Sequence, residues 1–439
     1  MPECKNGIRP RFSIKFIKVG RGLAPAVKVK RMFSIKINTN GGVTSPKGFM
    51  ANGIHCGIRK NKSKKDLMML ISEKECDAAA VYTKNLVYGA PITVTRKNLE
   101  NGKARAVICN SGIANTCNAD GIEKAQAMCD LAARYTGISA DDVIVGSTGV
   151  IGQPIDLEPI KNGMQELVDG LSDHGSDFAA EAIMTTDTVK KTISVSFDLD
   201  GKECTIGAIA KGSGMIHPNM ATMLSFITTD ADISAEMLKK ALTWCVNRSY
   251  NMLSVDGDTS TNDTVAIMAN GLCGNERIEA ENENYDKFCR ALFKICNYVV
   301  RMLARDGEGA TKLVICNVDN AQTEDIARTC AKSVICSPLV KTAMFGSDAN
   351  WGRILCALGY AGADIDVTKI DVSFVSAKGE ILVCRNGAGI EFSEAKAKEI
   401  LLEDEITIKV NLNDGEASAT AYGCDLTYEY VKINGDYRT

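Results

Sequence analysis

The feature that most limits how this chain can fold is a β-hairpin that leads into a glycine-rich loop near its middle. Apolar residues alternate from Ile193 to Leu199, and they alternate again from Cys204 to Ala210 beyond the dipeptide Asp200-Gly201. This pattern predicts two antiparallel strands joined by a tight turn with positive φ. The second strand leads into Lys211–Leu224, KGSGMIHPNMATML, a loop rich in Gly, Pro and Asn that enters an apolar segment at Thr222.

Thr222 has two interpretations. In the first, residues 222–228 are a buried strand entered through the glycine loop, because β-branched threonine is common in strands. In the second, the chain is cut before Thr222, and this residue carries both a hydroxyl nucleophile and a free α-amine that acts as its base. The local pattern alone favours the strand, so the choice depends on the rest of the chain.

Strands and helices are mixed along the whole length. Ser234 is a typical N-cap for a helix that ends near Asn247. Apolar residues at three- and four-residue spacing from Tyr285 to Met302 predict a core-facing helix. A further helix is predicted at 393–402. Two strands are predicted at 406–412 and 417–422, separated by a turn at Asp414-Gly415. No Pro- or Ser-rich linker divides them. The pattern predicts an α+β fold in which mixed and antiparallel sheets are covered by helices.

Composition excludes several functional classes. The 439 residues carry a net charge of -3, so no overall basic field favours nucleic acid. The sequence contains no run of 18 apolar residues, so no membrane span is expected. The sequence has 17 cysteines, none of them in a Cys-x-x-Cys pair, and only three histidines. These numbers and spacings favour buried free thiols over a zinc site. We therefore expect no metal, and buried thiols at positions such as Cys109, Cys316, Cys356 and Cys384.

The first 31 residues differ from the rest, with nine Lys or Arg against a single acidic residue, Glu3. A basic leader that is poor in acidic residues can be a transit peptide. It has one serine, Ser13, and little helical amphipathicity, which favours a dispensable, disordered extension, with Met32 opening the folded body. We expect a cytoplasmic protein, or a mitochondrial matrix protein if the leader is a transit peptide.

Several loops carry residues suited to chemistry. Gly146–Gly152 follows the apolar Val143–Val145 and is predicted to be a strand that ends in a glycine loop, where backbone N–H groups suit an oxyanion; the alternative is a plain turn. Glu308 stands between two glycines after a long helix, either as an accessible carboxylate or as a solvated turn residue. The hydroxyl cluster 184–188 is typical of a helix cap or turn. Residues 256–263 lack the register of a calcium-binding hand and are predicted to form a hydrogen-bonded turn.

Taken in order, these segments resemble the glutamate N-acetyltransferase family of arginine biosynthesis, also called ornithine acetyltransferase, over roughly residues 40–439. The segments that carry the resemblance are 41–49 (GGVTSPKGF), 147–149 (STG), 185–188 (TTDT), 211–224, 255–263 (VDGDTSTND), 306–312 (DGEGATK), 337–343 (SPLVKTA), 348–353 (DANWGR), Asn434 and Thr439. One departure is Ile113, where the family commonly has Asn. The family's fold is a layered α/β/β/α arrangement similar to N-terminal-nucleophile hydrolases, with a different connectivity.

The resemblance implies a precursor that cuts itself between Ala221 and Thr222, so that 32–221 form an α chain and 222–439 a β chain, intertwined in one globular unit. It implies Thr222 as nucleophile, with Thr148 and Gly149 as oxyanion stabilisers. The implied substrate-binding positions are Thr188, Lys211, Thr222, Glu308, Asn434 and Thr439. The implied reaction moves acetyl from N2-acetylornithine to glutamate through an acetyl-threonine ester.

The resemblance leaves some points open. Acetyl-CoA is a second acetyl donor in some members of the family, and no other cofactor is expected. Two α and two β chains are expected to form a heterotetramer. Two other readings compete: an autoprocessed aminopeptidase or amidohydrolase, which passes the acyl group from the same Thr222 to water, and a non-catalytic interaction protein, which predicts an uncut chain.

Overall fold

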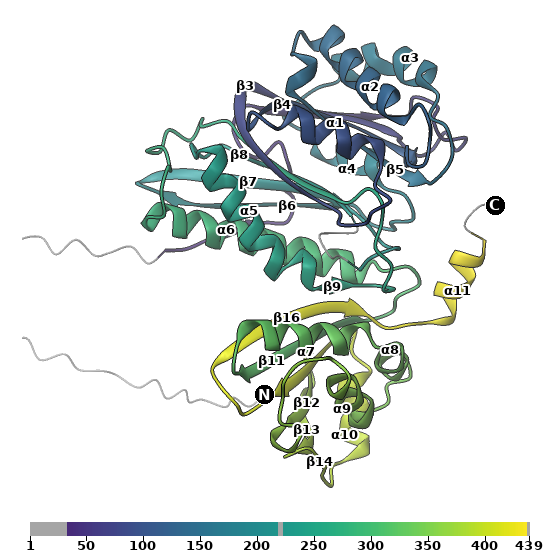
Figure 1. The fold of residues 1–439 in the computed structure, drawn as a ribbon, viewed down its shortest axis with the longest axis vertical. Helices are drawn as coiled ribbons and strands as arrows, with labels where there is room; N and C mark the ends of the chain where they lie inside the picture. Colours follow the sequence, from purple (N-terminus) through teal and green to yellow (C-terminus); the bar gives the residue numbers. More distant parts are fainter. Residues whose placement is uncertain (1–32, 218–222, 437–439) are drawn as a thin grey trace, which may run out of the picture. The chain divides into compact units, whose positions relative to one another are not determined.

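The computed structural model describes residues 33–217 and 223–436, which fall almost wholly within one compact unit, Ser34–Thr439 (Figure 1). The basic extension, Ala221, Thr222 and Thr439 lie outside the described residues. Within them, strands and helices alternate along the chain and build mixed sheets covered by helices. The fold is α+β, as predicted. No helix in these ranges combines the length and apolar character needed to cross a membrane.

The first sheet contains nine strands among the described residues. In pairing order these are β1 (Lys36–Asn38), β6 (Lys191–Leu199), β7 (Lys202–Lys211), β8 (Leu224–Thr229), β10 (Thr264–Ala269), β3 (Leu67–Tyr82), β4 (Lys103–Ile113) and β5 (Val143–Val150), with β2 (Phe49–Ile54) also pairing β3. The predicted hairpin is β6–β7, and Asp200 and Gly201 have φ values of 54° and 78°. β8 lies between β7 and β10, so strands from both sides of position 222 are neighbours in one sheet.

Strand β3 bends, and this folds the first sheet into two layers. Its first part pairs with β2 and β4, its second part pairs with β10, and the register shifts between Ile71 and Cys76. A bulge of this kind bends a strand. The two layers meet in a shared core, where a Cβ on Gly146 of β5 would lie 3.3 Å from the ring of Phe226 of β8.

Helices cover the outer faces of both layers. One face carries α1 (Ala90–Asn98), α2 (Gly121–Thr136) and α3 (Leu157–Asp169). The opposite face carries α5 (Ala235–Arg248) and α6 (Glu283–Arg305), while α4 (Ser176–Ile183) packs into the shared core. This is the helix–sheet–sheet–helix layering that the resemblance implied. The Ser234 side chain caps α5 by accepting from the Met237 N–H, as predicted. The predicted stripe of α6 is buried from Tyr285 to Val299, and Met302 at its end is partly buried.

A second sheet of seven strands follows in the described part of the chain. Its order is β14 (Ala388–Gly389), β13 (Gly379–Arg385), β12 (Asp371–Ser376), β15 (Glu405–Asn411), β11 (Leu313–Ala321), β16 (Ala417–Cys424) and β9 (Leu253–Ser254). Its helices are α7 (Glu324–Cys336), α8 (Pro338–Phe345), α9 (Trp351–Gly359) and α10 (Glu394–Leu401), and α11 (Tyr428–Gly435) follows the last strand. The hydrophobic core beside this sheet contains residues of α7, α8, α9 and α10.

The described cysteines form no disulfide bond. Cys109, Cys316 and Cys384 are buried as predicted. Cys356 is exposed, so that prediction is wrong. The reason is local: α9 buries Ile354, Ala357 and Leu358, and Cys356 lies off that face.

Candidate active site

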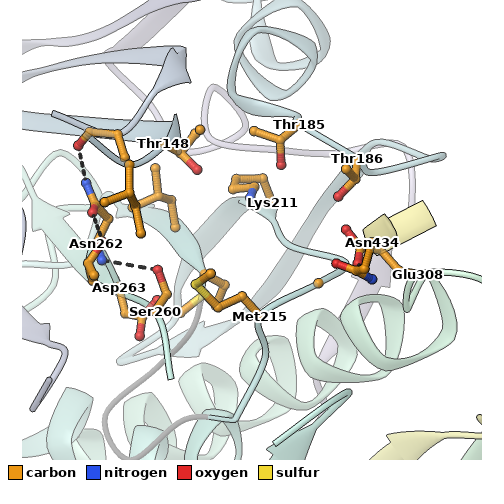
Figure 2. Close-up of a pocket in the computed structure, with 17 residues that line it drawn as sticks. Thr148, Thr185, Thr186, Lys211, Met215, Ser260, Asn262, Asp263, Glu308 and Asn434 are labelled. Carbon is orange, nitrogen blue, oxygen red and sulfur yellow. Dashed lines mark hydrogen bonds between the residues drawn. The ribbon is translucent and has the colours of Figure 1, made fainter. Parts of the chain in front are cut away.

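A pocket of about 200 Å³ lies where the ends of β5, β7 and the start of β8 meet the loops that follow α4 and α6. Figure 2 shows Glu308 and Asn434 at one end of it, Ser260, Asn262 and Asp263 at the other, and Lys211 between them. Its walls are Ala114, Thr148, Gly149, Ile151, Thr185, Thr186, Lys211, Gly214, Met215, Met223, Leu224, Ser260, Thr261, Asn262, Asp263, Glu308 and Asn434. Five of the residues singled out from the sequence are among them: Thr148, Gly149, Lys211, Glu308 and Asn434.

Thr148 and Gly149 reach the pocket from the end of a strand rather than from a loop. β5 continues to Val150 and pairs with β4 throughout, so the predicted glycine loop is in fact the end of the strand. Gly149 has φ 134°, which L side chains rarely adopt, and a Cβ there would lie 2.2 Å from the carbonyl carbon of Gly112. Only glycine therefore fits this close approach of two backbones. Its backbone is held beside the Thr148 hydroxyl at the pocket wall.

Lys211 ends strand β7 and is buried at the centre of the pocket. Burial lowers the pKa of its ammonium group, and the nearby carboxylates of Asp187 and Glu308 oppose that shift. The lysine thus has acidic neighbours that favour its charged form in a site with little water. A buried cation lining a pocket suits an anionic group of a ligand.

A buried ion network holds the segments around Lys211. The Lys191 ammonium lies 2.7 Å from Asp187 and 2.5 Å from Asp306, and all three side chains are almost completely buried. Asp187 also accepts from the Gly212 N–H at 2.6 Å and from the Thr185 N–H at 2.9 Å. Burial disfavours the Asp187 carboxylate, but its lysine neighbours and the Gly212 N–H hold its pKa below the usual range. The network therefore ties the loop after α4, the end of β7 and the end of α6 to one another.

Glu308 lies in a turn but is buried, which excludes the alternative of a solvated turn residue. Its N–H donates to the Ser213 carbonyl at 2.8 Å, and its Oε2 accepts from Asn434 Nδ2 at 2.8 Å. A Cβ on Gly214 would lie 2.2 Å from Oε2 of Glu308, so this glycine makes room for the carboxylate. Asn434 comes from α11, near the end of the chain, so two segments distant in sequence form one polar end of the pocket.

Residues 260–263 also line the pocket, whereas the sequence predicted only a hydrogen-bonded turn at 256–263. The Asn262 side chain donates to the carbonyls of Ala114 at 2.6 Å and Ser147 at 2.9 Å, so it anchors this loop to the end of β5. Asp263 is buried, and its Oδ2 has no hydrogen-bond partner among the described residues. Burial raises the pKa of Asp263 well above its usual range. Dense hydroxyl, amide and carboxyl groups in one loop were the available signal.

The remaining predicted residues are placed differently. Thr188 does not line the pocket; its N–H and Oγ1 donate to the carboxylate of Asp306. Thr185 and Thr186, from the same cluster, do line it. Thr222, Ala221 and Thr439 lie outside the described residues, but Met223, which directly follows Thr222 in the sequence, lines the pocket.

Comparisons with known proteins identify the family. Residues 50–439 match the model of the ArgJ family. The arginine biosynthesis bifunctional protein ArgJ of Caldanaerobacter subterraneus subsp. tengcongensis is 51% identical over 91% of this chain and 99% of its own. The Bacillus subtilis protein of the same name is 46% identical, covering 92% and 98% of the two chains.

A crystal structure of the Bacillus halodurans arginine biosynthesis bifunctional protein argJ is 44% identical, with a TM-score of 0.47 and coverage of 49% of this chain and 99% of that one. The family model alone spans most of the sequence, and the relatives match over nearly their full length. The resemblance found in the motifs is confirmed: this chain belongs to the ArgJ family.

Proposed function

We propose that this protein transfers the acetyl group of N2-acetyl-L-ornithine to L-glutamate, giving L-ornithine and N-acetyl-L-glutamate. The observation that carries the proposal is the pocket itself. Thr148, Gly149, Lys211, Glu308 and Asn434 come from distant parts of the sequence and line one cavity beside Met223. Membership of a family whose relatives are named for arginine biosynthesis supports the same reaction.

The proposed nucleophile is Thr222, freed by cleavage after Ala221. In the precursor its nitrogen belongs to the peptide bond, but its Oγ can attack the Ala221 carbonyl carbon. The C–N bond breaks as the C–O ester forms, the nitrogen gains a proton, and water then hydrolyses the ester. The product is a threonine with a free amine of ordinary pKa about 7.7–8.0, which can act as a base near neutral pH.

Acetyl transfer then follows in two steps. The Thr222 amine takes the Oγ proton while Oγ attacks the acetyl carbonyl, and the proton passes to the departing amine of ornithine. An acetyl-threonine ester remains until the amine of glutamate attacks it and returns the proton to Oγ. In both steps we assign the tetrahedral oxyanion to the Thr148 hydroxyl and the Gly149 N–H. Loss of one such donor costs about 2.7–4 kcal/mol in comparable sites.

The charged ends of the pocket suggest how amino-acid substrates are held. Lys211 is suited to a substrate carboxylate and Glu308 to an ammonium group, since each pairs opposite charges in a buried place. Asn434 and Thr439 complete the proposed binding set, whereas Thr188, which bonds Asp306 outside the pocket lining, stays a prediction of the resemblance. Amide and amine exchange without a net change in bond type, so the reaction itself needs neither nucleotide nor metal. Acetyl-CoA as an additional donor, the heterotetramer of two α and two β chains, and a cytoplasmic location stay predictions.

The test is an acetyl-transfer assay with purified protein. With N2-acetylornithine and glutamate, we expect N-acetylglutamate and ornithine in equal amounts, and parallel double-reciprocal plots, as a ping-pong mechanism requires. Omitting glutamate separates the alternatives. An amidohydrolase would release acetate at an undiminished rate without glutamate, and that result would overturn the proposal. Adding acetyl-CoA in place of N2-acetylornithine tests the second donor.

Replacing Lys211 by methionine should raise the Michaelis constant for the substrate roughly 10- to 100-fold, because a charged hydrogen bond contributes about 1.5–3 kcal/mol. Steady-state kinetics with both substrates measure this. Lys202→Met, at the exposed other end of the same strand, is the matched control and should leave the constants unchanged. Unchanged kinetics in Lys211→Met would remove this residue from the proposed binding set.

A further inference from the structure

Three metal-ligating side chains converge at the end of the first sheet opposite the pocket. Cys204 lies near the start of β7, Asp230 directly follows β8, and Cys273 lies in the loop after β10. β7 runs antiparallel to β8, and β8 runs parallel to β10, so the start of β7 and the ends of β8 and β10 lie at the same end of the sheet. One ligand atom from each residue lies within 4.8 Å of the other two, and all three residues are buried.

Asp230 is buried and has no side-chain ion pair among the described residues. Its side chain is 1% exposed, and within the described ranges no lysine, arginine or histidine forms an ion pair with it. Among the described residues, its carboxylate accepts from two backbone N–H groups, those of Thr205 at 2.8 Å and Lys47 at 3.3 Å. A buried carboxylate is costly unless it is paired or coordinates a metal. Two thiols beside it supply no positive charge, so a bound cation would complete the site.

The backbone holds the three side chains in place. The Cys273 N–H donates to the Asp230 carbonyl at 2.6 Å, which fixes the loop after β10 against the end of β8. The Thr229 hydroxyl lies 3.8 Å from the Cys204 sulfur, and the Cys273 sulfur lies 3.6 Å from the Glu203 carbonyl. Two of the three positions therefore lie at strand ends, and the third lies in a loop that a backbone hydrogen bond holds against them.

The donor set selects the kind of metal. Magnesium and calcium take oxygen ligands, and two sulfur donors disfavour both. Zinc binds thiolate and carboxylate together, commonly in a tetrahedral arrangement. We propose that Cys204, Asp230 and Cys273 bind one zinc ion, with water at the fourth position. On binding, each thiol gives up one proton to solvent, so two thiolates and one carboxylate surround a divalent ion.

A zinc ion at this site would stabilise the folded protein and would take no part in acetyl transfer. Lys211, at the pocket, lies seven residues beyond Cys204 on the same strand, or about 23 Å at the usual rise of a strand. The ion would join the ends of β7 and β8 to the loop after β10. Metal binding is thus separable from the proposed function, and either can fail while the other holds.

The experiment uses full-length protein stripped of metal by a chelator under reducing conditions. Cobalt(II) is added as a spectroscopic probe, followed by zinc in competition. We expect one cobalt per chain, with the charge-transfer absorption of cobalt bound to thiolate, lost on addition of zinc. Zinc should also raise the melting temperature without changing the acetyl-transfer rate. The spectrum needs no variant, so it tests the site even where a substitution harms folding.

Variants locate the ligands. Cys204→Ala, Cys273→Ala and Asp230→Asn should each weaken zinc binding at least tenfold. The matched controls are Cys384→Ala, a buried cysteine in the second sheet, and Asp232→Asn, a carboxylate two residues away that pairs with Arg277; both should bind as the parent does. Two results would overturn the proposal: no thiolate–cobalt absorption in the parent protein, or a Cys204–Cys273 disulfide in protein purified without reductant, seen as the loss of two hydrogen atoms in its mass.

Discussion

Replacing Thr222 by alanine is expected to leave the chain uncut and to abolish acetyl transfer. The variant lacks the hydroxyl that attacks the Ala221 carbonyl, so the amine of residue 222 stays within a peptide bond. It therefore lacks both nucleophile and base. Removal of a catalytic nucleophile typically costs a factor of about 10⁴–10⁶ in rate. Intact mass spectrometry under denaturing conditions, followed by the transfer assay, measures both effects.

Thr222→Ser is the matched variant, because it keeps a hydroxyl and, after cleavage, a free amine on the same residue. It should still be cut and retain measurable transfer. In the parent protein we expect two species, one of which begins at Thr222. Two chains in Thr222→Ala, or a single uncut chain in active parent protein, would each contradict the proposed maturation.

Lys191→Met should cause the largest loss of stability among single substitutions near the pocket. It removes the cation between Asp187 and Asp306 and leaves two buried carboxylates close together without a counter-charge. Breaking a buried ion pair from one side costs about 3–5 kcal/mol of unfolding free energy. Chemical denaturation measures this loss. Because Asp187 also holds the Gly212 N–H beside Lys211, the Michaelis constants should rise in whatever protein remains folded.

Lys190→Met provides the comparison. Lys190 is the neighbouring lysine, and it forms exposed ion pairs with Asp177 and Glu181. Exposed pairs of this kind contribute about 0–1 kcal/mol, so this variant should unfold almost as the parent does. Equal effects at positions 190 and 191 would show that burial of the network does not set its energetic contribution.

Local elements were predicted well from the sequence. The hairpin β6–β7, the cap at Ser234 and the stripe from Tyr285 each depend on residues close together in the chain. Turn chemistry, capping and helical spacing act over a few residues, so the sequence displays them directly. The same holds for the motif order that indicated the family.

The site was predicted only in part. Thr148, Gly149, Lys211, Glu308 and Asn434 were named from motifs, and the structure brings them to one pocket. Their local context was misjudged once, because the segment ending at Gly149 is strand rather than loop, and for Glu308 the sequence left open a solvated turn that its burial excludes. Pairing of Gly149 with β4 and burial of Glu308 against Asn434 both depend on segments distant in the sequence, which a local window does not show.

Several features were decided by tertiary structure alone. β15 and β16 are consecutive in the chain, yet β11 lies between them, because sheet order follows long-range pairing and not sequence order. Asp263 and its loop reach the pocket through hydrogen bonds from Asn262 to β5. Cys204, Asp230 and Cys273 are separated by tens of residues and carry no metal-binding spacing, but two strand ends and the loop after β10 bring them together.

The sequence by itself therefore determined the α+β class, the main helices and hairpin, the family, and the residue types that carry the proposed chemistry. Tertiary structure decided which of those residues share a pocket, how charged groups such as Lys191 are compensated, and which thiols meet a carboxylate. The physical reason is the distance along the sequence over which each interaction acts. Backbone preferences and hydrophobic periodicity act between neighbours in the chain, whereas burial and electrostatic pairing depend on contacts that exist only once the sheets have assembled.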